Sequence, residues 1–400
     1  MTSSDMTTRR APDSAPHLAL FMSNGGSLCA WERANILSRE IALYLEFLRS
    51  GLVASVIVFS YDFADRQRLA DAQRADQTFN SVRVVTPPRW CGAMKGLAAA
   101  FYSFFGVVAH RRRLLEADWF KTNQMSGAWA AIFAKWVCNR RLLIRQGYSL
   151  SRRFAKNNHA LRARLARAVE TAAYAAADAI AVTSTNAADA LRAREKLAAK
   201  VNLLPTYVDT SLFAPKDQYD FDEPVLYVGR FEPQKNLIAL VEGCRQAGRA
   251  IDLVGGGSLE PELLELAAKP GPPVRLLGSV ANETLPEVLR RYTVFALTSR
   301  HEGLPKVLIE AMSSGLVCVG SPIPGVTDLI DDHVTGYLTE GLSSDEIAAT
   351  IALAYSDRRA DVGRAGHAMV ERMFNLQHYA RQEARLYSPH DSFNPGPATR

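Results

Sequence analysis

The sequence has no long hydrophobic run. None of its uninterrupted apolar stretches reaches the roughly 18 residues expected of a membrane-spanning helix. Residues 1–16 contain no apolar core segment, so they do not have the pattern of a secretory signal, and we expect a disordered tail there and another over residues 389–400. With 48% hydrophobic and 22% charged residues, the composition is that of a soluble globular protein. We therefore expect a cytoplasmic protein.

Paired cysteines are also missing. The chain has 5 cysteines, an odd number, and no two of them form a C-x-x-C pair. This spacing argues against a zinc or disulfide framework and favours reduced thiols. No glycine turn has the full G-x-G-x-x-G fingerprint either, so a dinucleotide-dependent dehydrogenase is disfavoured.

Positive charge is concentrated in the first half of the chain. The whole sequence carries 47 Lys and Arg against 41 Asp and Glu, of which residues 1–205 hold 29 and 15, and residues 206–400 hold 18 and 26. Such a split predicts that the first half meets an anionic partner, such as a membrane surface, an acidic glycan or a nucleic acid. A solvated arginine-rich surface is the alternative.

The chain alternates between strand and helix patterns in two successive rounds. A short apolar run over 17–22 ends in the glycine turn Gly25-Gly26, a helical pattern follows up to Gly51, and a second strand is predicted over 53–59. The pattern restarts at Val225. It predicts an α/β fold with two Rossmann-like domains, over 17–208 and 209–373, and a ligand in the interdomain cleft at the carboxyl ends of the strands. The acidic stretch 217–223 is the predicted linker.

One helix of the first half is apolar almost all round. It covers residues 96–110 and is followed at once by Arg111, Arg112 and Arg113. A buried helix with a basic end is the interpretation that we favour. The alternative is a helix that lies in a bilayer interface, with its arginines on lipid headgroups.

The stretch 298–312 holds two glutamates, Glu302 and Glu310, around a predicted helix start at Leu304 or Pro305. The free N–H groups and the positive dipole end of such a helix suit a phosphate. Carboxylates on both sides of a phosphate are useful when each has hydroxyl groups to bind. The pattern therefore indicates a phosphorylated sugar, and a capped surface helix is the alternative.

A polar turn after the strand 225–228 carries Arg230 and Lys235. On a parallel sheet this turn should lie at the same edge as the helix start near Pro305. Two fixed cations there can neutralise a diphosphate, above all one whose charge develops as it leaves in the transition state.

These segments resemble a known family. The stretches LYVGRFEPQKN, LVGGGSLE, LLGSV, TSRHEGLPKVLIEAMSSG and PGVTDLI are similar to the C-terminal domain of retaining glycosyltransferases of family 4 (glycosyl transferase group 1), which have the GT-B fold. The resemblance covers about residues 200–387, and in the first domain it depends only on topology and on the turn at Gly25. It also implies that the last helix, over 374–388, crosses back onto the first domain.

The resemblance implies a role for each charged residue. Glu310 would bind the ribose hydroxyls of a nucleotide-sugar, Glu302 would contact the transferred sugar, and Arg230 and Lys235 would hold the diphosphate. Further contacts to the donor are implied at Gly25, Gly26, Gly229, Val280, Gly303, Leu304 and Lys306. No metal or other cofactor is expected, because the cations and the helix end supply the positive charge.

The implied function is transfer of a hexose-type sugar, with retention, from a nucleotide-sugar to a glycan or a lipid-linked acceptor, on a protein that can lie peripherally on an anionic inner membrane face. A nucleic-acid partner is not expected. Many family members have a histidine late in the first domain, and the corresponding stretch 121–127 has none. Asn123 or Gln124 could donate a hydrogen bond there, and the catalytic base stays unassigned. A sugar phosphorylase, an epimerase, or a non-catalytic nucleotide-sugar-binding protein on the same fold remain alternatives.

Overall fold

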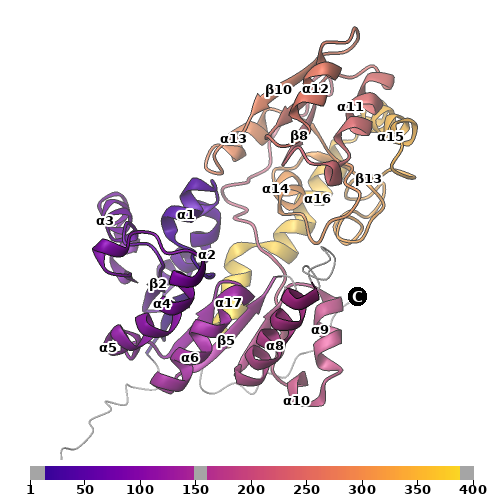
Figure 1. Ribbon diagram of the computed structural model, residues 1–400. Helices are drawn as coiled ribbons and strands as arrows, with labels where there is room; N and C mark the ends of the chain where they lie inside the picture. The colour runs from indigo at the N-terminus through magenta and orange to yellow at the C-terminus, as the bar shows by residue number, and fades with distance from the viewer. Residues whose placement is uncertain (1–13, 148–159, 388–400) are drawn as a thin grey trace, which may run out of the picture. The chain divides into compact units, whose positions relative to one another are not determined.

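The protein is described by a computed structural model over residues 14–147 and 160–387 (Figure 1). The chain forms two compact units, one of Met1–Pro205 and His378–Arg400, the other of Thr206–Gln377. Most of the two predicted tails lies outside the described residues. In the described parts of the chain, no helix has the length and apolarity needed to cross a membrane.

The first unit is built on a parallel sheet in the order β3-β2-β1-β4-β5-β6-β7. β1, β2 and β4 to β6 are buried along nearly their whole length, as expected of parallel strands covered on both faces. The strands are β1 (His17–Phe21), β2 (Ser55–Phe59), β3 (Val82–Val85), β4 (Trp119–Thr122), β5 (Arg141–Gln146), β6 (Ala179–Val182) and β7 (Val201–Leu203).

The helices of the first unit connect successive strands, and the helix patterns of the sequence agree with most of them. The bounds are α1 (Leu28–Arg33), α2 (Leu37–Arg49), α3 (Asp65–Ala75), α4 (Gly96–Ala109), α5 (Arg111–Leu114), α6 (Ala128–Cys138), α8 (Ala160–Ala176), α9 (Thr185–Arg192) and α10 (Glu195–Ala198), with short 3₁₀ turns over Gln77–Ser81, Arg89–Cys91 and Met125–Gly127.

The single helix expected between Gly26 and Gly51 is in fact two. The chain breaks between α1 and α2 at Asn35, whose φ is +53°. Asparagine tolerates this left-handed conformation better than most residues. The apolar positions keep a helical spacing across the break, so the periodicity alone did not reveal it.

The favoured prediction for α4, a buried helix, is wrong for one of its faces. Ala99, Tyr102 and Val107 are buried against the unit, whereas Phe101 and Phe105 are exposed. A helix that is apolar all round gives no sequence signal of which side faces the core.

The second unit repeats the architecture with the parallel order β10-β9-β8-β11-β12-β13. The strands are β8 (Val225–Val228), β9 (Ile251–Val254), β10 (Val274–Gly278), β11 (Val294–Leu297), β12 (Val317–Gly320) and β13 (Tyr337–Leu338). The helices are α11 (Leu237–Gln246), α12 (Glu260–Ala267), α13 (Leu285–Arg290), α14 (Lys306–Ser313), α15 (Ser344–Asp357) and α16 (Ala360–Phe374), with a 3₁₀ turn, η4, over Pro233–Lys235. α3 and α16 were not predicted.

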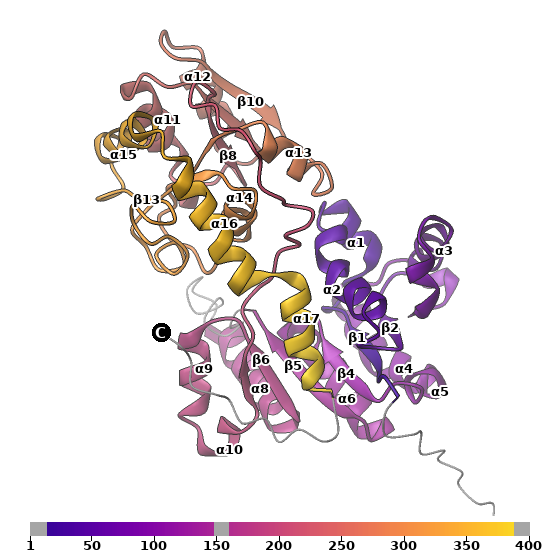
Figure 2. The same cartoon turned by 180° about the vertical axis from the view of Figure 1, so that it is seen from behind.

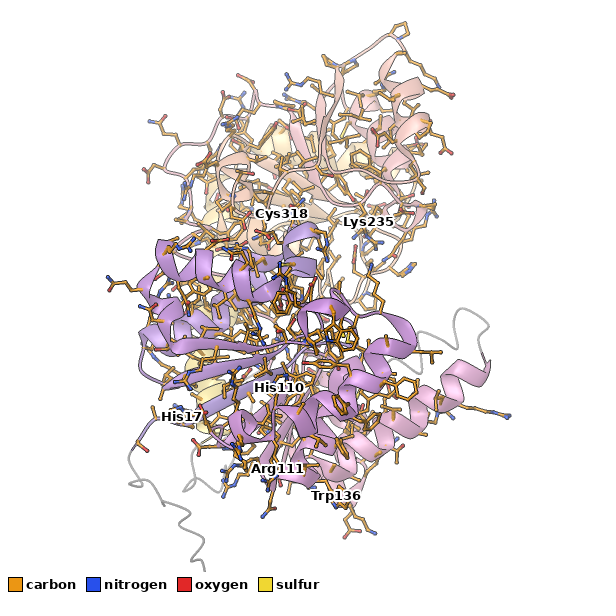
Figure 3. The ribbon with its side chains drawn as sticks, turned by 60° about the vertical axis from the view of Figure 1, so that its left-hand side comes forward. His17, His110, Arg111, Trp136, Lys235 and Cys318 are labelled. Carbon is orange, nitrogen blue, oxygen red and sulfur yellow. The ribbon has the colours of Figure 1, made fainter. Side chains whose placement is uncertain are left out.

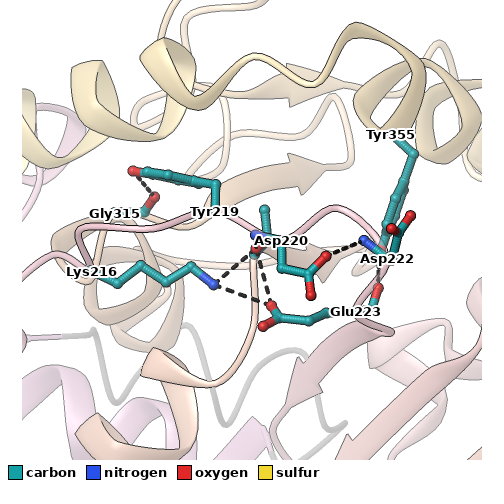
Figure 4. A network of polar contacts seen from close by, with 8 residues as sticks. Lys216, Tyr219, Asp220, Asp222, Glu223, Gly315 and Tyr355 are labelled. Carbon is teal, nitrogen blue, oxygen red and sulfur yellow. Dashed lines mark hydrogen bonds and ion pairs between the residues drawn. The ribbon is translucent and has the colours of Figure 1, made fainter.

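The acidic stretch 217–223 is bound to the second unit and is not a free linker. Thr293 Oγ1 accepts from the Lys216 ammonium (2.9 Å) and from the Asp220 amide (2.9 Å). Figure 4 shows Lys216, Asp220 and Glu223 in this network. Glu223 accepts from Lys216 at 3.1 Å, and Tyr219 donates to the carbonyl of Gly315 at 2.8 Å. These contacts fix the stretch in place, and the second unit already begins at Thr206.

The last helix, α17 (Leu376–Arg385), returns to the first unit and lies beside its strands (Figure 2). There Glu383 pairs with Lys121 of β4, and both side chains are fully buried. Tyr387 donates to Glu383 at 2.6 Å, and its carbonyl accepts from the Trp119 indole at 3.0 Å. The predicted return of the C-terminal helix is thereby confirmed.

The environment of this pair sets the pKa of both groups. Burial lowers the pKa of Lys121 to about 8, against the opposing attraction of Glu383. Burial by itself would raise the pKa of Glu383, but Lys121 and Arg145 outweigh it and hold that pKa below its usual value. The stabilisation from Glu383 is therefore present above the usual carboxyl pKa and is lost as the pH falls through the lowered one.

We expect Glu383→Gln to destabilise the first unit by about 3–5 kcal/mol, because it leaves the Lys121 ammonium buried without a counter-charge. A domain of this size loses about 2–4 °C of thermal midpoint per kcal/mol, so the midpoint should fall by roughly 10 °C. Arg74→Gln, which breaks the exposed Asp71–Arg74 pair, is the control and should change little. Equal midpoints for the two variants would contradict the anchoring role of the pair.

Candidate functional site

Two loops of the second unit come together because their strands are neighbours. β8 and β11 pair in parallel, with Leu226 opposite Phe295. The strand order reverses between them, since β9 and β10 lie on one side and β12 and β13 on the other. In doubly wound sheets such a switch point leaves a crevice at the carboxyl ends of the strands, where ligands bind. The loops that leave β8 and β11 carry the residues singled out in the sequence.

The turn after β8 is held in a tight conformation. Tyr227 donates its hydroxyl proton to the carbonyl of Arg230 at 3.0 Å. Gly229 has φ +156°, and a Cβ there would lie 2.5 Å from the Tyr227 hydroxyl. Behind it, a Cβ on Gly255 at the end of β9 would lie 1.8 Å from the Gly229 carbonyl. Gly255 is therefore required by close packing against backbone, whereas a Cβ on Gly229 is opposed by the Tyr227 side chain. The Arg230 side chain is left exposed.

Lys235 and Glu302 form the polar centre of the site. The Lys235 ammonium lies 2.5 Å from Glu302 Oε1, and Ser299 donates to the same oxygen at 2.7 Å. The two side chains are only 12% and 10% exposed. Figure 3 labels Lys235 in the second unit. This shielded ion pair thus joins Lys235, which was predicted to bind a diphosphate, to Glu302, which was predicted to contact a sugar.

The backbone ties the same two loops together. The Gln234 side-chain amide donates to the backbone carbonyl of His301 at 2.7 Å. The backbone carbonyl of Gln234 accepts from the backbone amide of Arg300 at 2.8 Å. These two hydrogen bonds are made by Gln234, Arg300 and His301, which lie next to Lys235 and Glu302 in the chain. The position of Lys235 relative to Glu302 is therefore set by main chain as well as by charge.

Helix α14 begins at Lys306, one or two residues after the predicted start, with Pro305 as its N-cap residue. No side chain caps this helix end. Uncapped N–H groups and the positive end of the dipole are available to an anion there. Lys306 adds a charge, its ammonium lying 5.3 Å from the centre of the Tyr207 ring.

Glu310 lies further along α14, and it is only 3% exposed. A carboxylate at that depth is hydrogen-bonded or paired with an opposite charge. Gly303 and Leu304 precede the helix in the same loop, and a Cβ on the nearby Gly325 would lie 1.9 Å from the Gly303 carbonyl. The loop is therefore closely packed up to the helix start.

The remaining predicted positions lie elsewhere. Val280 follows β10 and is half-buried. Gly25 and Gly26 lie in the first unit, in the turn between β1 and α1, where Gly25 has φ +75° and the Gly26 amide donates to the Ser23 carbonyl at 2.6 Å. Their expected contacts with a donor stay a prediction.

Neither His110 nor His301 is assigned as a catalytic base. His110 ends α4 with its Nε2 3.0 Å from the Thr86 carbonyl, and burial lowers its pKa. His301 is exposed on the loop before Glu302. Asn123 is buried, and Gln124 accepts from the Gly147 amide at 3.3 Å, which is a structural role.

One group of described residues, Cys29, Asp62 and Asp65, has the spacing of a metal site. Asp65 already accepts from the Leu28 amide at 2.7 Å and from the Cys29 amide at 2.9 Å at the start of α1. Burial, followed by the neighbouring Asp65, raises the pKa of the Cys29 thiol to about 12. The bonds that Asp65 accepts from the first amides of α1 are those of a helix cap, and we interpret the cluster in this way.

Sequence reasoning missed two members of the site. Ser299 bonds Glu302, and Gln234 joins the two loops. Both residues lie within motifs that were singled out, but serine and glutamine are common in loops, and their partners are determined by the pairing of strands.

Residues 210–369 match the profile of the family described as "Glycosyl transferases group 1". The second unit thus resembles the group 1 glycosyl transferases. The resemblance to group 1 glycosyl transferases stated from the sequence is confirmed, and the matched residues include the Lys235–Glu302 pair and all of α14.

Curated relatives match over a similar length. The putative glycosyltransferase EpsF of Bacillus subtilis is 33% identical over 174 residues, which are 39% of this chain and 44% of that protein. A GDP-mannose-dependent alpha-(1-6)-phosphatidylinositol monomannoside mannosyltransferase of Mycobacterium tuberculosis is 30% identical over 199 residues, 43% of this chain and 52% of that protein. The chain spans about half the length of these relatives.

A solved structure extends the likeness to both units. Anabaena Alr3699/HepE in complex with UDP and glucose aligns with a TM-score of 0.68 at 20% identity, over 93% of this chain and 99% of that one. At this identity the likeness shows the fold. The predicted GT-B fold with two Rossmann-like domains is confirmed.

We expect Gly255→Ala to lower the free energy of unfolding of the second unit by at least about 2 kcal/mol, because its φ of +146° and the Gly229 carbonyl both oppose a Cβ. Gly256→Ala is the matched control, since its Cβ would meet only ordinary contacts from 3.6 Å. Thermal unfolding of both variants checks this. Similar midpoints would show that the turn after β8 can relax.

Proposed function

We propose that the protein transfers a sugar from a nucleotide-sugar donor to a hydroxyl of a glycan or a lipid-linked acceptor, with retention of the anomeric configuration. The observation that carries the proposal is the shielded Lys235–Glu302 pair beside the uncapped end of α14. It is supported by the group 1 profile over residues 210–369 and by the UDP and glucose bound to the similar HepE fold.

The parts of a donor match the parts of the site. Its diphosphate would take Lys235 and Arg230 as counter-charges and the amides at the start of α14 as hydrogen-bond donors. Lys235 would then exchange one anionic partner for another, which frees Glu302 for hydroxyls of the sugar. Glu310 would accept hydrogen bonds from the ribose.

In the proposed step the bond between the anomeric carbon and the diphosphate oxygen breaks, and a bond from that carbon to the acceptor oxygen forms on the same face of the sugar. The acceptor proton passes to the leaving diphosphate, so no basic side chain is required. Charge grows on the diphosphate as it leaves, and preorganised cations lower the barrier by stabilising that charge. Arg230, Lys235 and the N-terminal end of α14 would supply this stabilising positive charge without a metal.

A thermal-shift panel of UDP-, GDP-, ADP- and dTDP-sugars tests the first requirement. A donor at a hundred times its Kd should stabilise the fold by about 2.7 kcal/mol. Product anomers assigned by NMR then test retention. If no nucleotide-sugar stabilises the protein, the proposed donor site is wrong, and stabilisation without transfer would favour the non-catalytic binding protein.

We expect the Arg230→Ala/Lys235→Ala variant to lower kcat by at least about a hundredfold, because the leaving diphosphate loses its fixed cations. The matched control is Lys269→Ala/Arg291→Ala, which removes two exposed cations of the same unit. Turnover with the donor found by the panel is the measurement. Near wild-type turnover of the first variant would contradict the assignment of these two residues.

We expect Glu310→Ala to raise the Kd of the donor by about 30- to 150-fold, equivalent to about 2–3 kcal/mol for two charge-assisted hydrogen bonds. Glu310→Gln keeps the side-chain volume and should give an intermediate value, and Glu265→Ala, which alters an exposed residue of α12, should leave the Kd unchanged. Titration calorimetry gives the constants. A Kd unaltered in both Glu310 variants would show that this carboxylate has only a structural role.

A further inference from the structure

Helix α4 has an exposed apolar face. Leu97, Phe101, Phe104, Phe105 and Val108 are between 45% and 80% exposed. They are spaced three and four residues apart, so they share one side of the helix. Single exposed hydrophobic residues are common, but a contiguous row of five marks an interaction surface.

The neighbouring helix α6 extends this face. The Phe104 ring contacts that of Phe133 with centroids 5.2 Å apart, and Phe133 lies 6.4 Å from Trp136. Trp136 is itself 82% exposed. We refer to this surface, formed by residues Leu97, Phe101, Phe104, Phe105, Val108, Phe133 and Trp136, as the α4 face.

Positive charge frames the α4 face at both ends of the helix. Lys95 precedes α4, and the exposed residues Arg111, Arg112 and Arg113 follow it. The Arg111 guanidinium lies 3.5 Å from the Val137 carbonyl, next in the chain to Trp136, and Figure 3 labels both Arg111 and Trp136 at this part of the unit. From residue 77 to residue 115 the sequence has 6 Lys and Arg and no Asp or Glu.

We propose that the α4 face docks on an anionic lipid surface. Aromatic and aliphatic side chains would enter the boundary between headgroups and acyl chains, while the flanking cations bind lipid phosphates. Association of two copies through this face would bring two arginine triplets together, and the exposed Glu116 that follows them already pairs with Arg83. The lack of acidic residues from 77 to 115 therefore favours a partner that is itself anionic.

This inference depends only on contacts of the first unit, and vesicle binding is independent of sugar transfer. If transfer to a lipid-linked acceptor also holds, docking would bring the enzyme to the surface that displays its acceptor. Loss of vesicle binding and loss of donor binding are measured separately, so each proposal can fail alone.

The test is co-sedimentation of the full chain with vesicles of phosphatidylcholine alone or mixed with phosphatidylglycerol. We expect binding to the mixed vesicles, and Phe101→Ser/Phe105→Ser should weaken it at least about tenfold. The control Leu264→Ser/Val334→Ser removes side chains that are 54% and 51% exposed in the second unit, and should not change binding. Thermal unfolding without ligand verifies that both variants are folded.

The charge requirement has its own pair of variants. Replacing Arg111, Arg112 and Arg113 by Gln should weaken binding at low salt roughly a hundredfold. The control replaces the exposed residues Arg192, Arg194 and Lys196 by Gln. Equal binding to both kinds of vesicle, or equal losses in the two triple variants, would overturn the proposal.

Tryptophan emission of the unaltered protein is a second readout. The emission of Trp136, which is 82% exposed on the α4 face, should shift to shorter wavelength when mixed vesicles are added. Trp136→Phe should remove most of the shift while co-sedimentation persists. A shift that survives in full in this variant, or self-association through the α4 face in place of vesicle binding, would contradict docking on lipid.

Discussion

The candidate site depends on the hydrogen-bonded pairing of β8 with β11. These strands are separated by nearly seventy residues of chain, yet Leu226 and Phe295 lie opposite each other. Only this pairing places the loop with Lys235 against the loop with Glu302. The tight glycines at 229 and 255 then allow the backbone to close behind them. The chemistry of the unit is therefore a consequence of its strand order.

Each unit contains an ion pair that is shielded from solvent, and the two pairs have different roles. In the first, the buried Lys121–Glu383 pair has no access to solvent and serves to hold α17. In the second, the Lys235–Glu302 pair is shielded but still about a tenth exposed, and it lies beside an uncapped helix end. A ligand can compete for the second pair and cannot reach the first. The same kind of contact is structural in one place and suited to binding in the other.

The architecture, and the loops of the second unit that come together, could be predicted from the sequence, because parallel strands are continuous apolar runs and their turns are rich in glycine. The contacts that the side chains of the site make with one another could not be predicted. Nothing in the spacing of Lys235 and Glu302 says that they form an ion pair, and Tyr227 gives no signal that it holds the Arg230 carbonyl. Helix α4 was assigned to the core because its composition does not distinguish its two sides, and Asn35 breaks a helix whose periodicity continues. These failures all concern tertiary neighbours, which a local pattern does not specify.

The return of α17 has a consequence for how the chain acquires its structure. The second unit is an insertion within the first, whose core includes residues on both sides of that insertion. Until Glu383 and Tyr387 are made, Lys121 and the Trp119 indole lack the partners that they have in the finished protein. During synthesis, therefore, all residues of the second unit are available before the first unit has its full set of contacts.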